Sequence, residues 1–107
     1  MGSVALAADS GGGEVEEDKE ISIFRSQKKS GGVWEYDTKV SGIFKKTKTV
    51  WSNYWHPKVT HGSAAQLGAN RPSRSCVKKD LTARSKQSSF NTKLTGYAYW
   101  NKSCTMT

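Results

Sequence analysis

Trp51-Ser-Asn-Tyr-Trp-His-Pro-Lys-Val-Thr-His-Gly-Ser-Ala-Ala65 is the stretch of sequence that decides the fold. It contains three aromatic residues and both histidines of the chain, His56 and His61. The aromatic residues before Pro57 are typical of a half-buried strand, and the proline forbids a continuous helix. The small residues after His61 resemble a second strand, so the pattern predicts a hairpin turned near Pro57-Lys58. Since two strands alone are marginally stable in water, the rest of the chain must supply partners.

Short segments of alternating hydrophobicity lie on both sides of this stretch. They cover residues 21–25, 33–37, 74–80 and 96–101, with turn residues between them. In the last segment the alternation places Tyr97 and Tyr99 on one face, and Ala98 and Trp100 on the other. Strands spaced by about ten residues are typical of antiparallel sheets. We therefore predict an all-β fold, either a small antiparallel β-sandwich or a partly open barrel.

Composition limits the size of the core. The chain has 107 residues, of which 35% are hydrophobic, and its mean hydropathy is −0.70. One small domain of this kind usually needs a covalent or metal cross-link. The two cysteines, Cys76 and Cys104, most simply form a disulfide, which chain-entropy arithmetic values at about 3.5 kcal/mol. A metal pair is the alternative, but their spacing does not match a C-x2-C ligand motif.

Charge is divided unevenly along the chain. Residues 1–20 carry six acidic residues and one lysine, whereas residues 21–107 carry sixteen Lys and Arg against three acidic residues, a net charge of +13. Such a basic domain attracts polyanions and anionic membrane surfaces. The alternative is that the lysines only keep the protein soluble.

The N-terminal residues predict a flexible arm. Glycines 11–13 and the following acidic run bury too little surface to offset ordering entropy, so we predict a disordered acidic arm over residues 1–19 and a basic β domain over residues 20–107. Ala5 and Ala7 match the small-residue pattern before a signal-peptide cleavage site, which indicates a secreted protein, although the alanines alone also fit an unstructured arm. No apolar run is long enough to span a bilayer as a helix. One hypothesis is that the arm folds back and screens the basic domain.

Several of these residues resemble the lactococcin 972 family of secreted bacteriocins. The resemblance runs from about residue 32 to residue 101, and its parts are Gly32-Val-Trp34, Ser52-Asn-Tyr54, His56, Thr60-His61 and Tyr97-Ala-Tyr-Trp-Asn101. It implies a β domain that acts at the surface of Gram-positive cells. Members of the family are associated with binding the cell-wall precursor lipid II and blocking septum formation without pores.

The resemblance also suggests ligand-binding residues, because lipid II offers anionic phosphates and sugar rings. The predicted contacts are Trp51, Tyr54, Trp55, His56 and His61. The predicted electrostatic steering residues are Lys58, Arg71, Arg74, Lys78 and Lys79. The alternative for the aromatic residues is core packing, and for the imidazoles it is hydrogen bonding to backbone groups.

Other functional classes fit less well. An enzyme lacks a nucleophile motif and a local acid beside the histidines, and a zinc site lacks ligands in the same segment, so no catalytic residue, metal or cofactor is predicted. A nucleic-acid-binding β module shares the basic and aromatic composition but has no recognition signature here. A secreted adhesion module without killing activity also fits. Strand-edge association would allow a homo-oligomer, and contact with membranes would be peripheral.

Overall fold

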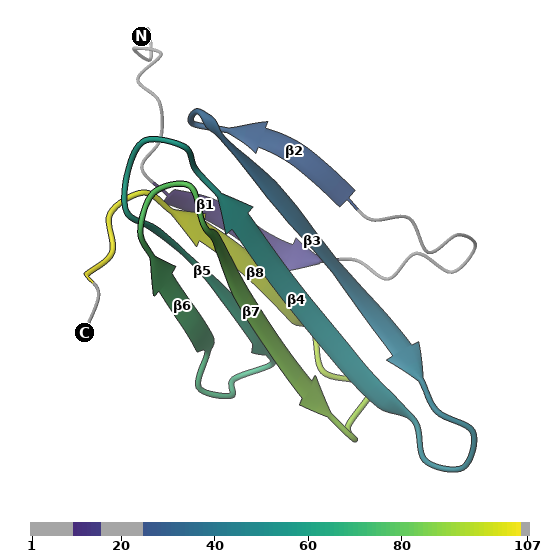
Figure 1. The fold of residues 1–107 in the computed structure, drawn as a ribbon. Helices are drawn as coiled ribbons and strands as arrows, with labels where there is room; N and C mark the ends of the chain where they lie inside the picture. Colours follow the sequence, from purple (N-terminus) through teal and green to yellow (C-terminus); the bar gives the residue numbers. More distant parts are fainter. Residues whose placement is uncertain (1–9, 16–24, 106–107) are drawn as a thin grey trace, which may run out of the picture.

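The computed structural model describes residues 10–15 and 25–105, and within them it contains eight β-strands and no helix. Figure 1 shows the strands in chain order. Their bounds are β1 (Ser10–Val15), β2 (Arg25–Lys29), β3 (Gly32–Ser41), β4 (Thr47–Trp55), β5 (His61–Leu67), β6 (Ser73–Val77), β7 (Thr82–Ser89) and β8 (Gly96–Asn101).

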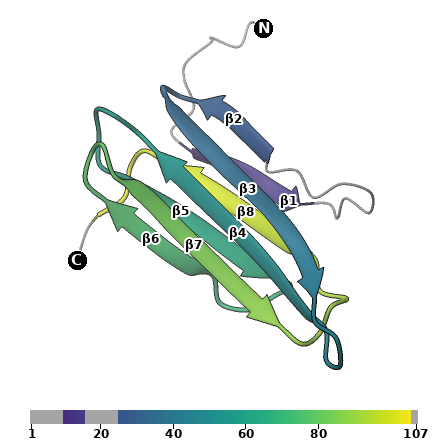
Figure 2. The same cartoon turned by 45° about the vertical axis from the view of Figure 1, so that its right-hand side comes forward.

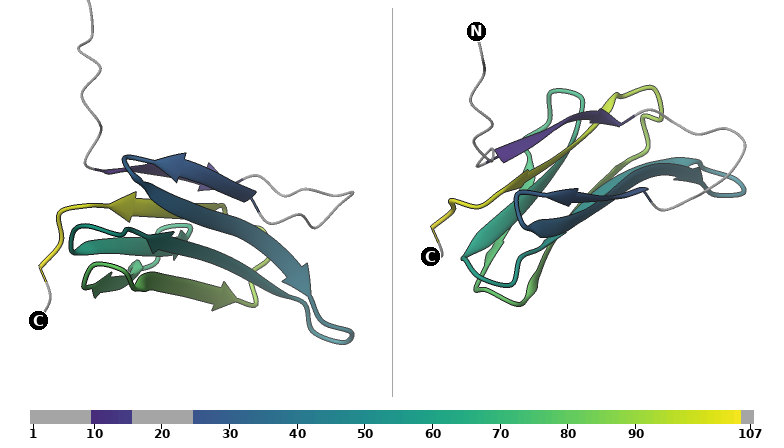
Figure 3. Two further views of the ribbon diagram at one scale, coloured as in Figure 1. Left: turned by 45° about the horizontal axis from the view of Figure 1, so that its top comes forward. Right: turned by 90° about the horizontal axis from the view of Figure 1, so that it is seen from above.

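The strands form two antiparallel sheets of four strands that face each other (Figures 1 and 2). We call β1-β8-β5-β6 the β8 sheet and β2-β3-β4-β7 the β4 sheet. The two layers are seen from other directions in Figure 3. The all-β prediction is confirmed, and of its two forms the sandwich is correct, because the sheets do not close into a barrel.

The predicted hairpin near Pro57 is wrong. Strand β4 pairs with β3 and β7, whereas β5 pairs with β6 and β8, so residues 56–60 cross from one sheet to the other. The two strands meet face to face across the core, where the rings of Tyr54 and His61 lie 5.6 Å apart edge to face. A crossing and a hairpin share the same local pattern of strand, proline-containing turn and strand. Burial of side chains from both strands favours the crossing.

The core lies between the inner faces of the sheets. Strand β4 alternates strictly, with Val50, Ser52 and Tyr54 buried and the residues between them half-buried. The buried apolar cluster consists of Val15, Trp34, Val50, Tyr54, Ala65, Leu67, Ala98 and Trp100. Ser52 is satisfied in this core, because the Trp34 Nε1–H donates to its Oγ at 2.8 Å and the hydroxyl donates to the Tyr99 carbonyl at 2.7 Å.

One side of the sandwich is joined by small polar side chains. Ser63 on β5 and Ser85 on β7 are buried, and their hydroxyl oxygens lie 2.8 Å apart. The Ser63 hydroxyl is also 3.0 Å from the Ala83 carbonyl oxygen. Short side chains let the two sheets approach closely here, and every buried polar atom in the contact has a partner.

Strand β1 departs from the predicted flexible arm. Residues 10–15 pair with β8 along their whole length, while residues 1–9 and 16–19 of the expected arm lie outside the described residues. A Cβ on Gly11 would lie 2.9 Å from the Trp100 ring, and Gly12 has a φ of +127°. The glycines therefore permit both the close approach to β8 and the unusual backbone, a role that composition alone does not reveal.

The predicted disulfide between Cys76 and Cys104 is confirmed, with a Cα–Cα distance of 6.0 Å. It connects β6 to the segment after β8. A Cβ on Gly62, which lies opposite Cys76 in the sheet, would be 3.0 Å from the Cys104 sulfur. The bridge therefore passes over a glycine on the outer face of the β8 sheet.

Candidate functional site

His56 is buried at the start of the crossing between the sheets. Its Nδ1 accepts a hydrogen bond from the Lys58 backbone N–H at 3.1 Å, and its Nε2 lies 3.0 Å from the Ser30 carbonyl oxygen. The neutral imidazole protonated on Nε2 satisfies both contacts, since it offers one acceptor and one donor. His56 therefore holds the crossing segment against the turn between β2 and β3.

His61 is fully buried at the other end of the crossing. Its Nδ1 lies 2.7 Å from the Val59 carbonyl oxygen and its Nε2 lies 2.6 Å from the Leu81 carbonyl oxygen. Either neutral tautomer donates to one of the two carbonyls, and the imidazolium donates to both. The ring thus ties the crossing to the start of β7.

Tyr54 packs between these rings and Trp100, and its side chain is fully buried. The hydroxyl donates to the Lys29 carbonyl at 2.7 Å. Burial raises the pKa of Tyr54 to about 12, because the phenolate would lose its hydration. Tyr54, His56 and His61, predicted as ligand contacts, therefore stabilise the interior and present almost no surface to a ligand.

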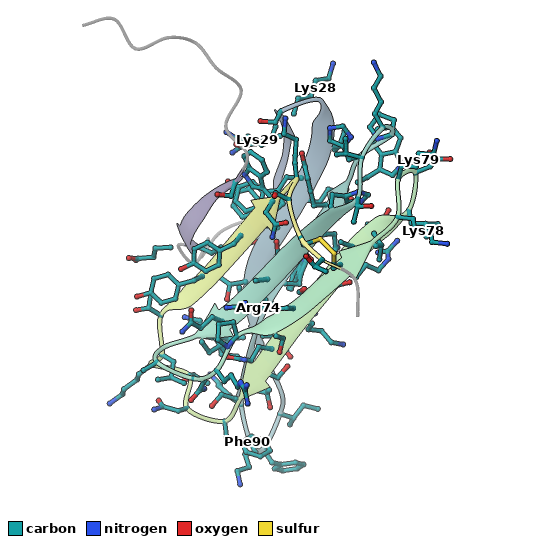
Figure 4. The ribbon with its side chains drawn as sticks, turned by 90° about the vertical axis from the view of Figure 1, so that its left-hand side faces the viewer. Lys28, Lys29, Arg74, Lys78, Lys79 and Phe90 are labelled. Carbon is teal, nitrogen blue, oxygen red and sulfur yellow. A yellow bond between two sulfur atoms is a disulfide. The ribbon has the colours of Figure 1, made fainter. Side chains whose placement is uncertain are left out.

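Three predicted steering residues gather at the same end of the sandwich. We call residues 30–31, 56–60 and 78–81 the histidine end. The Asp80 backbone N–H donates to the His56 carbonyl at 2.7 Å, which joins the loop that carries Lys58 to the loop that carries Lys78 and Lys79. All three lysines are exposed, and Figure 4 shows Lys78 and Lys79 pointing away from the sandwich. The histidine end is a basic surface over a buried polar interior.

The two predicted tryptophan contacts lie on the outer face of the β4 sheet. Trp51 and Trp55 are half-buried, on the side of β4 opposite Tyr54. In the sheet Trp51 lies between Asp37 and Lys86. Trp51 and Trp55 therefore belong to a different surface from the other predicted residues, and a small ligand on the opposite sheet cannot touch them.

The outer face of the β8 sheet carries a groove with a volume of about 1150 Å³. One row across the sheet reads Gly12, Tyr99, Ala64 and Arg74 on four successive strands. Because neighbouring strands lie about 4.8 Å apart, Tyr99 and Arg74 stand about 10 Å from each other with only Ala64 between them. Figure 4 shows Arg74 over this face. Ala64 forms the floor of the groove, with Tyr99 as an aromatic wall on one side and Arg74 as a cationic wall on the other.

Tyr97 does not line the groove but stands next to it on the same face, and its ring lies parallel to that of Tyr99 with centroids 6.4 Å apart. Neither tyrosine was among the predicted contacts, although the alternation of residues 96–101 had placed both on one face. The disulfide forms part of the groove, since Cys76 and Cys104 both line it. Arg71, the remaining steering residue, is exposed in the loop between β5 and β6, at the end opposite the histidine end.

The walls of the groove are suited to binding a ligand. In the part of the chain that the structure describes, no three His, Cys, Asp or Glu side chains gather closely enough to hold a metal ion. The same residues include no helix long and apolar enough to cross a membrane. An aromatic wall and a guanidinium across a small floor can hold a ring-shaped ligand and an anionic group at once.

Comparison with known proteins identifies the family. The family model described as Bacteriocin (Lactococcin_972) matches residues 30–100, which is more than half of the chain. No curated protein and no solved structure matches the chain. The match runs from the turn before β3 to Trp100 in β8, whereas β1, β2 and Cys104 lie outside it. The chain belongs to the lactococcin 972 family of bacteriocins.

Proposed function

We propose that this protein is a secreted bacteriocin that binds the cell-wall precursor lipid II at the surface of Gram-positive cells and blocks septum formation without forming pores. Membership of the bacteriocin family supports antimicrobial activity. The observation that carries the ligand assignment is the groove on the outer face of the β8 sheet. It combines the two features that a phosphorylated glycolipid requires of a binding surface.

The first feature is the pair of parallel tyrosine rings. Tyr99 lines the groove beside a floor made by Ala64, and Tyr97 continues the aromatic surface next to the groove. Sugar rings expose C–H groups on one face, and these pack on aromatic rings while the hydroxyl groups stay in water. The groove therefore suits the disaccharide of the precursor.

The second feature is Arg74 on the opposite wall. It is exposed on β6, and its guanidinium can donate paired hydrogen bonds to phosphate oxygens or to a carboxylate. Lys58, Lys78 and Lys79 at the histidine end raise the local concentration of anionic ligands by steering. Among the ten residues predicted from sequence, Arg74 is the one that lines this groove.

The cellular test uses purified, oxidised protein added to dividing Gram-positive cells with and without purified lipid II. We expect inhibition of growth at the septum, relieved when lipid II is added in excess over the protein, and no leakage of a small dye. Inhibition that persists in excess lipid II, or that is accompanied by leakage, would contradict the proposed mechanism. A protein that binds cells without killing would support the alternative of a secreted basic adhesion module.

Matched variants locate the site. Arg74→Gln should lose most of the inhibition, because one phosphate contact is removed. Arg71→Gln removes the same charge from an exposed loop outside the groove and should keep inhibition within about twofold. Equal loss in both variants would show that only net charge matters and would reject the groove as the site.

A further inference from the structure

Three large apolar side chains project into solvent at the end of the sandwich opposite the histidine end. Ile43 is 90% exposed and Phe44 is 101% exposed, both in the loop of residues 42–46 between β3 and β4, and Phe90 is 65% exposed in the loop between β7 and β8. We call these three residues the apolar tip. Figure 4 shows Phe90 at this end, far from Lys78 and Lys79.

The two loops of the tip are held next to each other. The Lys45 Nζ lies 4.3 Å from the centroid of the Phe90 ring, a cation–π contact between the loops. The pairing of β3 with β4 continues to Ser41 and Thr47, so the loop begins directly at the end of a paired ladder. Gly42 has a φ of +122°, and a Cβ there would collide with the Lys45 carbonyl oxygen. The backbone therefore presents Ile43 and Phe44 at the end of a fixed hairpin.

Folding does not explain why these side chains are apolar. Among the described residues, the core is built from Trp, Tyr, Val, Leu and Ala side chains, and neither Phe44 nor Phe90 belongs to it. Single exposed apolar residues are common, but adjacent ones on two loops form a patch that marks an interaction surface. Within the part of the chain that the structure describes, the three side chains of the patch stay exposed, which marks it as a surface for a partner.

The charges beside the tip identify that partner. Lys39, Lys45, Lys46 and Lys93 are exposed on the strands and loops that form this end. Residues 41–46 and 89–95 contain no acidic residue. A second copy of the chain would bring these lysines against each other, whereas an anionic bilayer offers phosphates to the lysines and acyl chains to the apolar side chains. We propose that the apolar tip docks the protein on anionic lipid bilayers, with Ile43 and Phe44 inserted below the headgroups.

Docking by the apolar tip leaves the groove accessible, and it does not depend on ligand binding in the groove. Arg74 lies between the tip and the histidine end along the sandwich (Figure 4). A protein docked by its tip therefore keeps the groove above the membrane and the histidine end pointing away from it. The proposal applies to any bilayer of the required charge, with or without a wall precursor.

The test is co-sedimentation of the oxidised full chain with vesicles that contain phosphatidylglycerol and phosphatidylcholine but no lipid II. We expect binding to these vesicles and little binding to pure phosphatidylcholine. The double variant Ile43→Ser/Phe44→Ser should bind at least about tenfold more weakly, since two buried apolar side chains are lost. The matched control is Leu81→Ser, which removes an exposed apolar side chain beside Lys78 and Lys79 at the other end and should bind like the original chain.

A second pair of variants separates docking by the tip from attraction by net charge. Lys45→Gln/Lys46→Gln should weaken binding by roughly fivefold per lysine, and Lys78→Gln/Lys79→Gln should have a clearly smaller effect. Equal losses in the two pairs, or unchanged binding by Ile43→Ser/Phe44→Ser, would overturn the proposal. A dimer in sedimentation that Phe44→Ser dissociates would also overturn it, in favour of self-association. Because these vesicles lack lipid II, neither result bears on precursor binding.

Discussion

The two ends of the sandwich use similar residues in opposite ways. At the histidine end, the Tyr54 ring and both imidazoles turn inward and hydrogen-bond to backbone groups. The side chains left in solvent there are three lysines, Asp80 and the smaller apolar residues Val59 and Leu81, which are only 38% and 54% exposed. At the apolar tip, Ile43 and Phe44 turn outward among lysines and contact little of the chain. The rings at the histidine end stabilise the interior of the sandwich, whereas the apolar side chains of the tip stay exposed among the described residues and are available to a partner.

The difference corrects a natural inference about unusual residues. Residues 51–65 hold the highest density of aromatic residues and histidines, which suggested a binding surface. The structure instead buries three of them, Tyr54, His56 and His61, where the chain crosses between sheets, because a crossing leaves backbone carbonyls without strand partners. His61 reaches two such carbonyls, of Val59 and Leu81. Buried polar groups need partners, and an imidazole supplies two nitrogen positions on a flat ring.

The largest expected effect comes from the covalent link beside the histidine end. Cys76→Ser/Cys104→Ser should lower the free energy of unfolding by about 3.5 kcal/mol, because the disulfide restricts the unfolded chain. Denaturant titration of the oxidised and variant proteins measures this difference. Reductant should lower the stability of the original chain and leave the variant unchanged; a loss below about 1 kcal/mol would mean that the histidine end does not need the link.

The next effect should come from His61. His61→Ala removes a fully buried ring and its hydrogen bonds to carbonyl groups, and we expect a loss of about 3 kcal/mol in thermal or chemical unfolding. Lys58→Ala is the control, because this exposed side chain lies in the same crossing segment and should change stability by less than about 0.5 kcal/mol. A folded His61→Ala protein of normal stability with lost activity would return His61 to the list of ligand contacts.

Tyr54→Phe should have a smaller effect with a defined pH dependence. Loss of the hydrogen bond to the Lys29 carbonyl should cost about 1 kcal/mol at neutral pH. The pKa of Tyr54 is raised to about 12 in the folded protein, so its contribution is fully present below the unfolded-state pKa near 10 and is lost as the pH rises through 12. The variant should therefore lose less stability than the original chain over this range.

The smallest effect on stability is expected at the apolar tip. Ile43→Ser/Phe44→Ser should change the free energy of unfolding by less than about 0.5 kcal/mol, since both side chains are exposed. Thermal unfolding in solution without lipid measures it. A loss of 2 kcal/mol or more would show that the tip packs on the chain itself and would remove the contrast between the two ends.

Local pattern predicted much of the fold. Strict alternation predicted residues 96–101 as the last strand with its tyrosines on one face, and the cysteine count predicted the disulfide. Strand β1 could not be predicted in this way, because half of its residues are glycines and it shows no alternation of apolar and polar side chains. The crossing at Pro57 could not be distinguished from a hairpin, since the pairing partners of β4 and β5 are set by strands far away in the sequence.

The groove was harder to predict than the strands. Its central row, Gly12, Tyr99, Ala64 and Arg74, comes from four strands whose order in the sheet is unrelated to their order in the chain. Sequence reasoning identified Arg74 from its charge but not the tyrosines opposite it. Ala64 can be recognised as the floor of a site only when its neighbours on the two adjacent strands, Tyr99 and Arg74, are known.

The most direct test of the account is a calorimetric titration of lipid II in neutral lipid nanodiscs with the original chain, Tyr99→Ala and Trp55→Ala. Neutral lipid minimises charge-driven docking by the tip, and the two variants remove aromatic rings from the outer faces of opposite sheets. The account predicts at least about tenfold weaker binding by Tyr99→Ala and unchanged binding by Trp55→Ala. Unchanged binding by Tyr99→Ala together with lost binding by Trp55→Ala would contradict it and move the site to the β4 sheet.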